Sequence, residues 1–326
     1  MIWTGAIRVE AGVITQGAVV ALVNYMSQIL VELVKLANLI ITVTKAIACG
    51  NRIQDVFEVS SSLPDDAKED VKEQTWQDPD AEMVRFEHVG LVYQEASEES
   101  LTDITFTAKK GDVIGIIGGT GAGKTSLVNL IPRFYDSTSG KIRIAGEDIR
   151  NYPLAQLREK IGVVPQRAVL FYGTIRSNMQ WGKKDATDEE IWEALETAQA
   201  ADFVKQKNGM LDALVEQGGK NFSGGQRQRL TIARALVKKP QILILDDSAS
   251  ALDYATDAAL RKAIREKLKG TTVFIVSQRA ASILHADQIL VLDDGNTAGM
   301  GTHEELLGNC EVYREIYESQ FGKGEK

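Results

Sequence analysis

The stretch Gly118-Gly119-Thr120-Gly121-Ala122-Gly123-Lys124-Thr125 decides the fold of this chain. It fits the phosphate-binding pattern G-x-x-x-x-G-K-[S/T] at every fixed position, between an apolar run over 113–117 and a helical stretch that starts at Ser126. Glycines let successive backbone N–H groups turn toward phosphate oxygens, and the helix N-terminus adds the positive end of its dipole. A glycine-rich turn with a chance lysine is the alternative, and the flanking strand and helix argue against it.

The chemistry of this loop predicts a nucleotide with magnesium. Lys124 has the length to reach the β- and γ-phosphates, and the Thr125 hydroxyl is a ligand suited to Mg²⁺. The apolar run Ile242–Leu245 ends in Asp246, which we expect to hold the magnesium through water. Such a strand is weak evidence by itself, but it gains weight in a chain that carries a phosphate loop.

The pattern from Glu82 to Lys326 is that of a cytosolic α/β domain. The segments 84–93, 104–118 and 141–149 read as strands joined by turns that contain glycine, and 241–245 and 272–276 read as buried parallel strands. Thr187 and Glu190 form a predicted capping box that opens a helix through Ala198. A further helix is expected over Gly225–Val237.

The first 60 residues differ from this domain. Ala11–Val31 is a run of 21 residues without a charge, just long enough to span a bilayer. We expect a transmembrane helix that emerges into the cytosol near Lys45 and Arg52, and the alternative is a long amphipathic helix packed on protein. Residues 61–81 follow as an acidic linker, with seven acids against two lysines over 61–80.

Composition narrows the class of protein. The 326 residues include 37 basic and 45 acidic side chains, for a net charge of −8, which gives no support for nucleic-acid binding. The two cysteines, Cys49 and Cys310, have no metal-site spacing and predict no disulfide, which fits a reducing cytosolic setting. The three histidines are His88, His285 and His303.

The run Asn221-Phe222-Ser223-Gly224-Gly225-Gln226 resembles the signature sequence of the ABC transporter superfamily. The other motifs of that family follow in order along the chain. Tyr93 matches the aromatic that stacks on adenine, Gln166 matches the Q-loop that touches magnesium, and 250–253 matches the D-loop. The resemblance covers essentially the whole chain. It implies a P-loop ATPase domain with a RecA-like core, an antiparallel β subdomain and a helical subdomain.

The resemblance further implies an exporter-type half-transporter. Residues 1–60 resemble the last transmembrane helix of such a half, so we expect five further spans to be missing. The implied cofactors are ATP and Mg²⁺. The implied nucleotide-binding residues are Tyr93, Gly118, Gly119, Thr120, Gly121, Ala122, Gly123, Lys124, Thr125, Ser126 and Gln166, and the implied magnesium ligands are Thr125, Gln166 and Asp246.

Members of this family pair head to tail, so that each ATP lies between one chain's phosphate loop and the other chain's signature. The resemblance therefore implies that Ser223, Gly224, Gly225 and Gln226 act on ATP held by a second exporter half. The expected location is the inner or plasma membrane, with the ATPase domain in the cytoplasm.

Three positions depart from the family pattern of a hydrolytic site. Asp247 stands where the family has the Glu that activates water, Gln278 stands where it has the switch His, and Gln217 stands near a usual Glu. The binding motifs are intact. This combination resembles the degenerate-site subunit of heterodimeric bacterial multidrug exporters, and the alternative is drift in a decaying gene.

Two other functions stay open at this point. One is a soluble ABC ATPase of translation or DNA repair, against which the hydrophobic N-terminus and the acidic balance argue. The other is a nucleotide-binding regulatory module without turnover. The transported substrate is not readable from these residues.

Overall fold

The computed structural model describes residues 1–326 except 60–62, 64–75, 77–81, 95, 249–250 and 323–326. The chain divides into two units, Met1–Pro64 and Asp65–Lys326, each with its own internal contacts. Most of the predicted acidic linker, and Ser250 of the predicted D-loop, lie outside the described residues.

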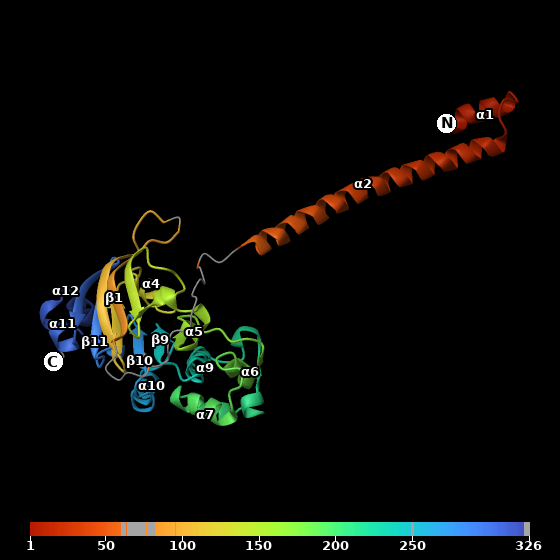
Figure 1. Cartoon of the computed structure of the whole chain (residues 1–326). Helices are drawn as coiled ribbons and strands as arrows, with labels where there is room; N and C mark the ends of the chain where they lie inside the picture. Colours follow the sequence, from red (N-terminus) through yellow and green to blue (C-terminus); the bar gives the residue numbers. More distant parts are fainter. Residues whose placement is uncertain (60–62, 64–75, 77–81, 95, 249–250, 323–326) are drawn as a thin grey trace. The chain divides into compact units, whose positions relative to one another are not determined.

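The N-terminal unit consists of two helices, α1 (Ile2–Glu10) and α2 (Gln16–Glu58) (Figure 1). The uncharged run that predicts a membrane helix begins at Ala11, whereas helix α2 begins at Gln16. Gly12 adopts a left-handed φ of 69°, and the Thr15 side chain caps a new helix by accepting a hydrogen bond from the N–H of Ala18 at 3.3 Å. The chain therefore turns over 11–15 and begins a separate helix at Gln16.

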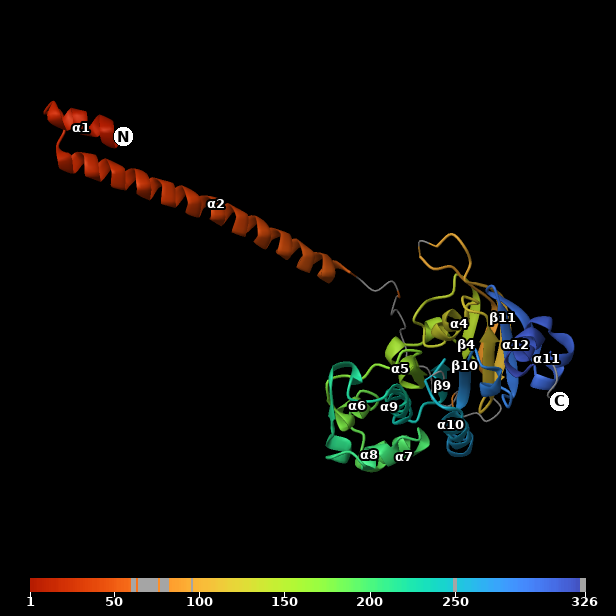
Figure 2. The same cartoon turned by 180° about the vertical axis from the view of Figure 1, so that it is seen from behind.

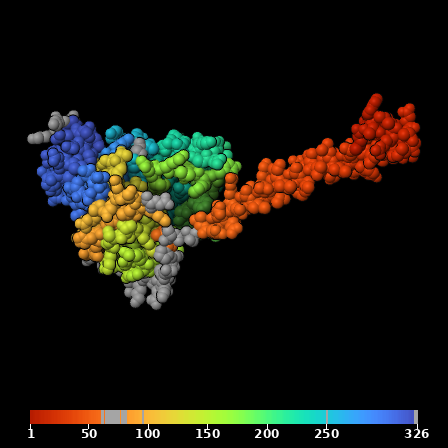
Figure 3. All heavy atoms as spheres, turned by 90° about the horizontal axis from the view of Figure 1, so that it is seen from above, coloured from red at the N-terminus to blue at the C-terminus, as the bar shows by residue number. Residues whose placement is uncertain are grey.

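Helix α2 is long and apolar enough to cross a membrane, the one such helix among the described residues. Its 43 residues correspond to about 65 Å, roughly twice the thickness of a bilayer's hydrocarbon core. None of its residues is buried, and its side chains lie open along the face seen in the space-filling view (Figure 3). The exposed apolar residues in its middle include Ile29, Leu30, Leu33, Val34, Leu36, Leu39, Ile40 and Ile41.

The second unit is built around a six-stranded sheet in the order β12-β11-β3-β10-β9-β6 (Figures 1 and 2). All of its neighbours pair in parallel except β11 and β12. In spatial order, the strands are β12 (Asn296–Gly301), β11 (Gln288–Asp293), β3 (Val113–Gly118), β10 (Thr272–Val276), β9 (Ile242–Asp246) and β6 (Ile161–Val164).

Alternate residues of these strands enter two different cores, because successive side chains of a strand point to opposite faces. In β9, Ile242 and Ile244 belong to one cluster, and Leu243 and Leu245 belong to the other. Both clusters consist of buried apolar side chains, so the central strands are continuous apolar runs, as is typical of a parallel sheet covered on both faces.

An antiparallel sheet, in the order β2-β1-β4-β5, covers one of these faces. Phe106 links the two sheets, since its ring stacks on Phe86 at 4.6 Å between centroids and meets Phe274 of β10 edge-on at 6.3 Å. The strands are β1 (Glu82–Leu91), β2 (Leu101–Lys109), β4 (Ser139–Ile144) and β5 (Glu147–Asp148), and a separate two-stranded ribbon joins β7 (Gly173–Thr174) to β8 (Leu214–Val215).

Helices cover the rest of this unit, with α6, α7, α8 and α9 gathered on the side away from β1 and β11 (Figures 1 and 2). They are α4 (Lys124–Leu130), α5 (Leu154–Glu159), α6 (Ile175–Gln180), α7 (Asp188–Thr197), α8 (Ala201–Lys205), α9 (Gly224–Leu236), α10 (Tyr254–Lys267), α11 (His303–Asn309) and α12 (Glu311–Phe321). The short 3₁₀ turns are η1 (Ile149–Asn151), η2 (Met210–Asp212), η3 (Gln217–Gly219) and η4 (Ala280–Ser282).

The predicted α/β fold is confirmed, with antiparallel and parallel sheets in one unit. The predicted capping box is present in α7, where Thr187 and Glu190 bond each other's backbone N–H groups. The helix predicted over Gly225–Val237 runs over Gly224–Leu236.

Trp76 lies within the segment predicted to be a solvated linker, yet it is only 2% exposed. Its ring meets Tyr152 edge-on at 5.8 Å, and its carbonyl accepts a hydrogen bond from Lys110 Nζ at 3.0 Å. It belongs to the core cluster shared with the antiparallel sheet. The second unit therefore takes a large apolar side chain from before the predicted boundary at Glu82.

We predict that Trp76→Ala destabilises this unit by about 3–5 kcal/mol, the usual cost of truncating a buried Trp. Chemical unfolding of the purified chain measures the change. Trp181→Ala is the matched control, because Trp181 is 70% exposed and should cost no more than about 1 kcal/mol. Equal effects of the two changes would contradict the burial of Trp76.

Candidate functional site

The polar residues of the site meet at the carboxyl edge of the parallel sheet. Strand β10 pairs with β3 on one side and with β9 on the other, in parallel register. The phosphate loop follows β3, Asp246 ends β9, and Gln278 lies two residues after β10. Parallel strands bring their carboxyl ends to one edge, so segments far apart in the sequence converge there.

The phosphate loop needs glycine at two of its positions for steric reasons. A Cβ at Gly118 would collide with the carbonyl oxygen of Leu292 in β11. Gly123 has a φ of 88°, and a Cβ there would lie 2.7 Å from the carbonyl oxygen of Ser100. The loop is thus packed closely against its neighbours while its backbone keeps the turned conformation.

Lys124 is nearly buried at the start of α4, and its ammonium group folds back onto the loop. Its Nζ donates to the carbonyl oxygens of Gly118 at 3.0 Å and Gly119 at 2.5 Å. Burial lowers its pKa, although the carboxylates of Asp247 and Asp246 act in the opposite direction. An anion placed in the loop would therefore meet a cation that is already desolvated and positioned.

Asp246 and Thr125 form a polar pair beneath the loop. The Thr125 hydroxyl lies 3.1 and 3.0 Å from the two carboxylate oxygens of Asp246. Burial raises the pKa of Asp246, and nearby Asp247 raises it further, while Thr125 and Lys124 lower it. A buried carboxylate beside a hydroxyl is a hard-oxygen donor set of the kind Mg²⁺ prefers.

These residues fit magnesium only together with further oxygen ligands. Among the described residues, no group of three or more His, Cys, Asp or Glu side chains forms a complete metal site. Mg²⁺ usually combines one or two carboxylates with waters and substrate phosphates. The pair Thr125 and Asp246 would supply the protein's share of such a set.

Asp247 occupies a strained backbone position immediately after β9. Its φ is 44°, in the left-handed region, where Asp is one of the few residues tolerated. Gln166 Nε2 donates to its Oδ2 at 3.2 Å, and burial raises the pKa of its carboxyl. The predicted Q-loop glutamine and the predicted water-activating carboxylate are thus in direct contact.

The cavity at this edge has a volume of about 500 Å³ and brings ten of the predicted site residues together. Those ten are Thr120, Gly121, Gly123, Lys124, Thr125, Ser126, Gln166, Asp246, Asp247 and Gln278. The remaining lining residues were not predicted; they are Ala96, Glu98, Glu99, Ser100, Val276, Ser277, Asp294 and Gly295.

Tyr93 lies beside this cavity without lining it. Its hydroxyl donates to Ser126 Oγ at 2.8 Å, and its ring meets Tyr135 edge-on at 5.0 Å. Gly118, Gly119 and Ala122 belong to the phosphate loop but do not line the cavity. The adenine-stacking role of Tyr93 stays a prediction.

The signature residues lie apart from this cavity, because none of them lines it. Ser223 caps α9: its hydroxyl oxygen accepts from the N–H of Gln226 at 3.3 Å, and Gln226 Oε1 accepts from the N–H of Ser223 at 3.1 Å. Gly224 starts α9, and a Cβ at Gly225 would lie 3.2 Å from the carbonyl oxygen of Ala251. Ser223 and Gly224 are exposed.

Sequence reasoning missed two groups of residues around the site. Glu98, Glu99 and Asp294 line the cavity from loops with no motif of their own. Gln320 of α12 bonds the backbone on both sides of Arg279, more than 40 residues earlier in the chain. No local pattern signals a contact of that kind.

The buried carboxylate of Asp246 generates a prediction about stability. Because its pKa is raised above the ordinary value of 3.8, the folded state takes up this proton at a higher pH than the unfolded state, and the ionised form opposes folding at neutral pH. We expect Asp246→Asn, which keeps an acceptor for Thr125, to raise the unfolding midpoint of the nucleotide-free chain at pH 7. The gain should shrink as the pH falls through the raised pKa toward 3.8.

Thermal unfolding of both proteins across this pH range measures the difference. Asp293→Asn, at an exposed position at the end of β11, is the control and should change little. An Asp246→Asn chain that is less stable than the original at pH 7, by the same margin at every pH, would contradict the assignment of a desolvated carboxylate.

Comparisons with known proteins agree with this geometry. Residues 101–250 match the ABC transporter family. The chain is 41% identical over 323 residues to the uncharacterized ABC transporter ATP-binding protein YfiB of Bacillus subtilis. That match covers 99% of this chain and 55% of YfiB. It is 39% identical over 317 residues to the probable multidrug resistance ABC transporter ATP-binding/permease protein YheI of the same organism. That match covers 97% of this chain and 53% of YheI.

A solved structure of a bacterial Atm1-family ABC exporter with ATP bound is also similar. It has a TM-score of 0.79 and 31% identity, and the match covers 87% of this chain and 49% of that one. The chain spans about half the length of the curated relatives it matches. With the phosphate loop, Asp246 and the signature on one scaffold, this chain carries an ATP-binding domain of the ABC transporter family.

Proposed function

We propose that this chain binds Mg-ATP in the cavity at the carboxyl edge of the parallel sheet. The observation that carries the proposal is the convergence there of Lys124, Thr125 and Asp246. Lys124 would exchange its contacts with the loop carbonyls for the β- and γ-phosphates. Thr125 and Asp246 would hold magnesium, with Gln166 nearby through its contact with Asp247. Magnesium would neutralise charge on the phosphates during their transfer.

We infer further that the chain is the ATPase half of an exporter and couples ATP hydrolysis to movement of a substrate across a membrane. Relatives named as multidrug exporters and the exposed apolar helix α2 support this. The ATPase domain would lie in the cytoplasm. In a soluble ABC ATPase, a 43-residue helix with its apolar side chains exposed would face water, which is energetically unfavourable.

The signature is suited to a second subunit's nucleotide. Ser223 Oγ accepts the Gln226 N–H, so the hydroxyl proton remains available for an anion. The exposed N-terminus of α9 adds its dipole and the free amides of its first turn. Ser223, Gly224 and Gly225 would therefore stabilise charge on ATP held by a partner. Gln226 completes the capping box at the start of this helix.

The residues for water activation suggest that the chain's own site is degenerate. Asp247 is one methylene shorter than Glu, and a displacement near 1 Å can cost about 10²-fold in rate. Its carboxylate also bonds Gln166. Gln278 brings an amide to the cavity where the family pattern has an imidazole. We propose that the partner is a different exporter half, which supplies the competent site of a heterodimer.

We predict that Lys124→Ala abolishes high-affinity binding of a fluorescent ATP analogue to the purified chain. The buried ammonium is the one lysine that lines the cavity among the described residues, and no other cation there can replace it. Lys141→Ala, at an exposed position in β4, is the control and should leave affinity unchanged. Undiminished binding by Lys124→Ala would refute the site.

We also predict that the double change Asp247→Glu with Gln278→His raises ATP turnover by the purified chain about 10²-fold, because it supplies a water-activating carboxylate of full length and an imidazole. Phosphate release at saturating ATP measures this rate. Adding Ser223→Ala to the double variant should remove most of the gain, since two copies would complete each other's sites and one lost donor costs about 10²–10³-fold.

Two results would overturn the hypothesis that the chain's own site is degenerate. One is an unmodified chain that already turns over near the enzyme median of about 10 s⁻¹. The other is a double variant that binds ATP normally but hydrolyses it no faster. Asp293→Glu controls for an added methylene at a site without catalytic function.

A further inference from the structure

The segment after β10 carries Gln278 into the nucleotide cavity, and helix α12 contacts its backbone directly. Gln320 Nε2 donates to the carbonyl oxygen of Gln278 at 2.7 Å, and Gln320 Oε1 accepts from the N–H of Ala280 at 2.9 Å. One side-chain amide therefore satisfies an acceptor and a donor two residues apart, as a neighbouring strand would.

Helix α12 is firmly anchored, so this contact is not that of a loose surface side chain. Tyr313 is fully buried and its hydroxyl lies 2.8 Å from His303 Nδ1. Tyr317 and Phe321 stack on each other at 4.6 Å and pack, with Ile316, against the core beneath the sheet. These residues and Gln320 recur at helical spacing on one face of α12.

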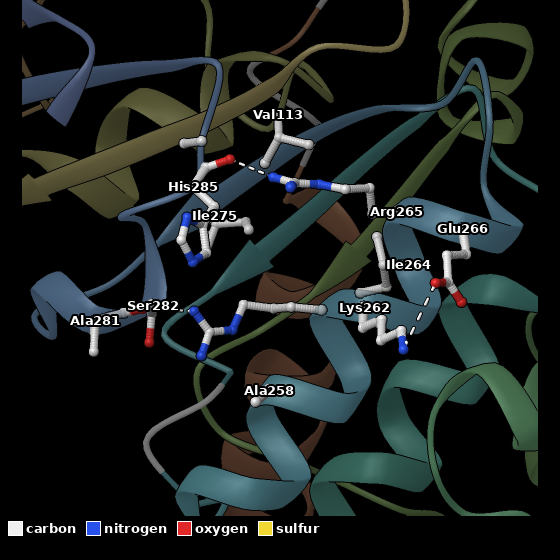
Figure 4. Close-up of a pocket in the computed structure, with 12 residues that line it drawn as sticks. Val113, Ala258, Lys262, Ile264, Arg265, Glu266, Ile275, Ala281, Ser282 and His285 are labelled. Carbon is white, nitrogen blue, oxygen red and sulfur yellow. Dashed lines mark hydrogen bonds and ion pairs between the residues drawn. The ribbon is translucent and has the colours of Figure 1, made fainter.

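The same segment is held from its other side by α10. Arg261 Nη1 donates to the carbonyl oxygen of Ala281 at 2.6 Å, and Ser282 Oγ lies 3.4 Å from Asp257. Arg265 donates to the carbonyl oxygen of His285, as the dashed line in Figure 4 marks. His285, Ala281 and Ser282 line a cavity of about 310 Å³ together with residues of α10. The guanidinium groups of Arg261 and Arg265, which border this cavity, thus both donate hydrogen bonds to backbone carbonyl oxygens.

In this segment Ser277 and Gln278 line the nucleotide cavity, and Arg279 lies between the two residues that Gln320 bonds. Gln278 lines the cavity, and its own carbonyl is the one that Gln320 binds. Ser277 fixes the preceding turn, because its Oγ accepts from the N–H of Arg279 at 2.9 Å. The direction of the Gln278 side chain thus depends on backbone bonds that Gln320 completes.

We propose that Gln320 is a positioning residue for the nucleotide site: it holds the backbone of 278–280 so that the Gln278 amide faces the γ-phosphate of bound ATP. This inference rests on the proposed function for the identity of the ligand. Helix α12 thereby controls how well the site distinguishes ATP from ADP, although it does not itself line the cavity.

The test compares three variants of the full chain. Gln320→Ala removes both hydrogen bonds. Gln320→Glu keeps an acceptor for Ala280 but loses the donor to Gln278. Ser319→Ala is the control, since the Ser319 hydroxyl bonds only within its own helix, to Ile316 at 2.7 Å. Two measurements apply to each: amide hydrogen exchange over 277–283, and the affinities for Mg-ATP and Mg-ADP.

We expect Gln320→Ala to speed exchange of the Ala280 amide by roughly fivefold, the factor for one ordinary hydrogen bond, and to lower the ATP-to-ADP affinity ratio by a similar factor through weaker ATP binding alone. Gln320→Glu should keep Ala280 protected and still lower the ratio. Ser319→Ala should match the original chain in both measurements.

Unchanged exchange in Gln320→Ala would show that the contact does not hold the segment. Faster exchange with an unchanged affinity ratio would show that the contact holds the segment without positioning Gln278. Either result overturns the proposal. Failure of the proposed function looks different, because the unmodified chain would then bind neither nucleotide, while the exchange measurement would still report on the contact.

Discussion

The parallel pairing of β10 between β3 and β9 is the constraint on which the site depends. It brings Lys124, Asp246 and Gln278 to one edge although they come from three separate segments. Two apolar clusters cover the faces of this sheet, so its strands cannot slip by one residue without moving every core side chain to the wrong face. The register that fills the cores also sets the positions of the polar residues.

Much of the site could be predicted from the sequence because its motifs are local. The glycines of the phosphate loop and the Ser223–Gln226 capping box each involve a few successive residues, and their spacing carries the geometry. Trp76 is a residue for which local sequence reasoning fails. Composition places it in an acidic, solvated stretch, but packing against Tyr152 buries it. Gln320 is similar, since only the folded chain brings it to Ala280.

In the proposed site, the departures from the family pattern would affect the activation of water and not the binding of nucleotide. Asp247 has a left-handed backbone, a conformation that Asp tolerates better than most residues do. Once Asp occupies the position, its bond to Gln166 joins two parts of the site that a longer carboxylate would contact differently. Under the proposed function, this arrangement would favour holding a nucleotide in place over hydrolysing it.

The raised pKa of the Asp246 carboxyl has a consequence for how cation binding is measured. A magnesium ion held by Asp246 as proposed would require this carboxylate in its ionised form, so protons and magnesium would compete for the same oxygens. Near the raised pKa, binding of magnesium at this site would then release protons into the buffer. The heat recorded by titration calorimetry will then contain the ionisation enthalpy of that buffer, and the intrinsic binding enthalpy emerges only from titrations in several buffers.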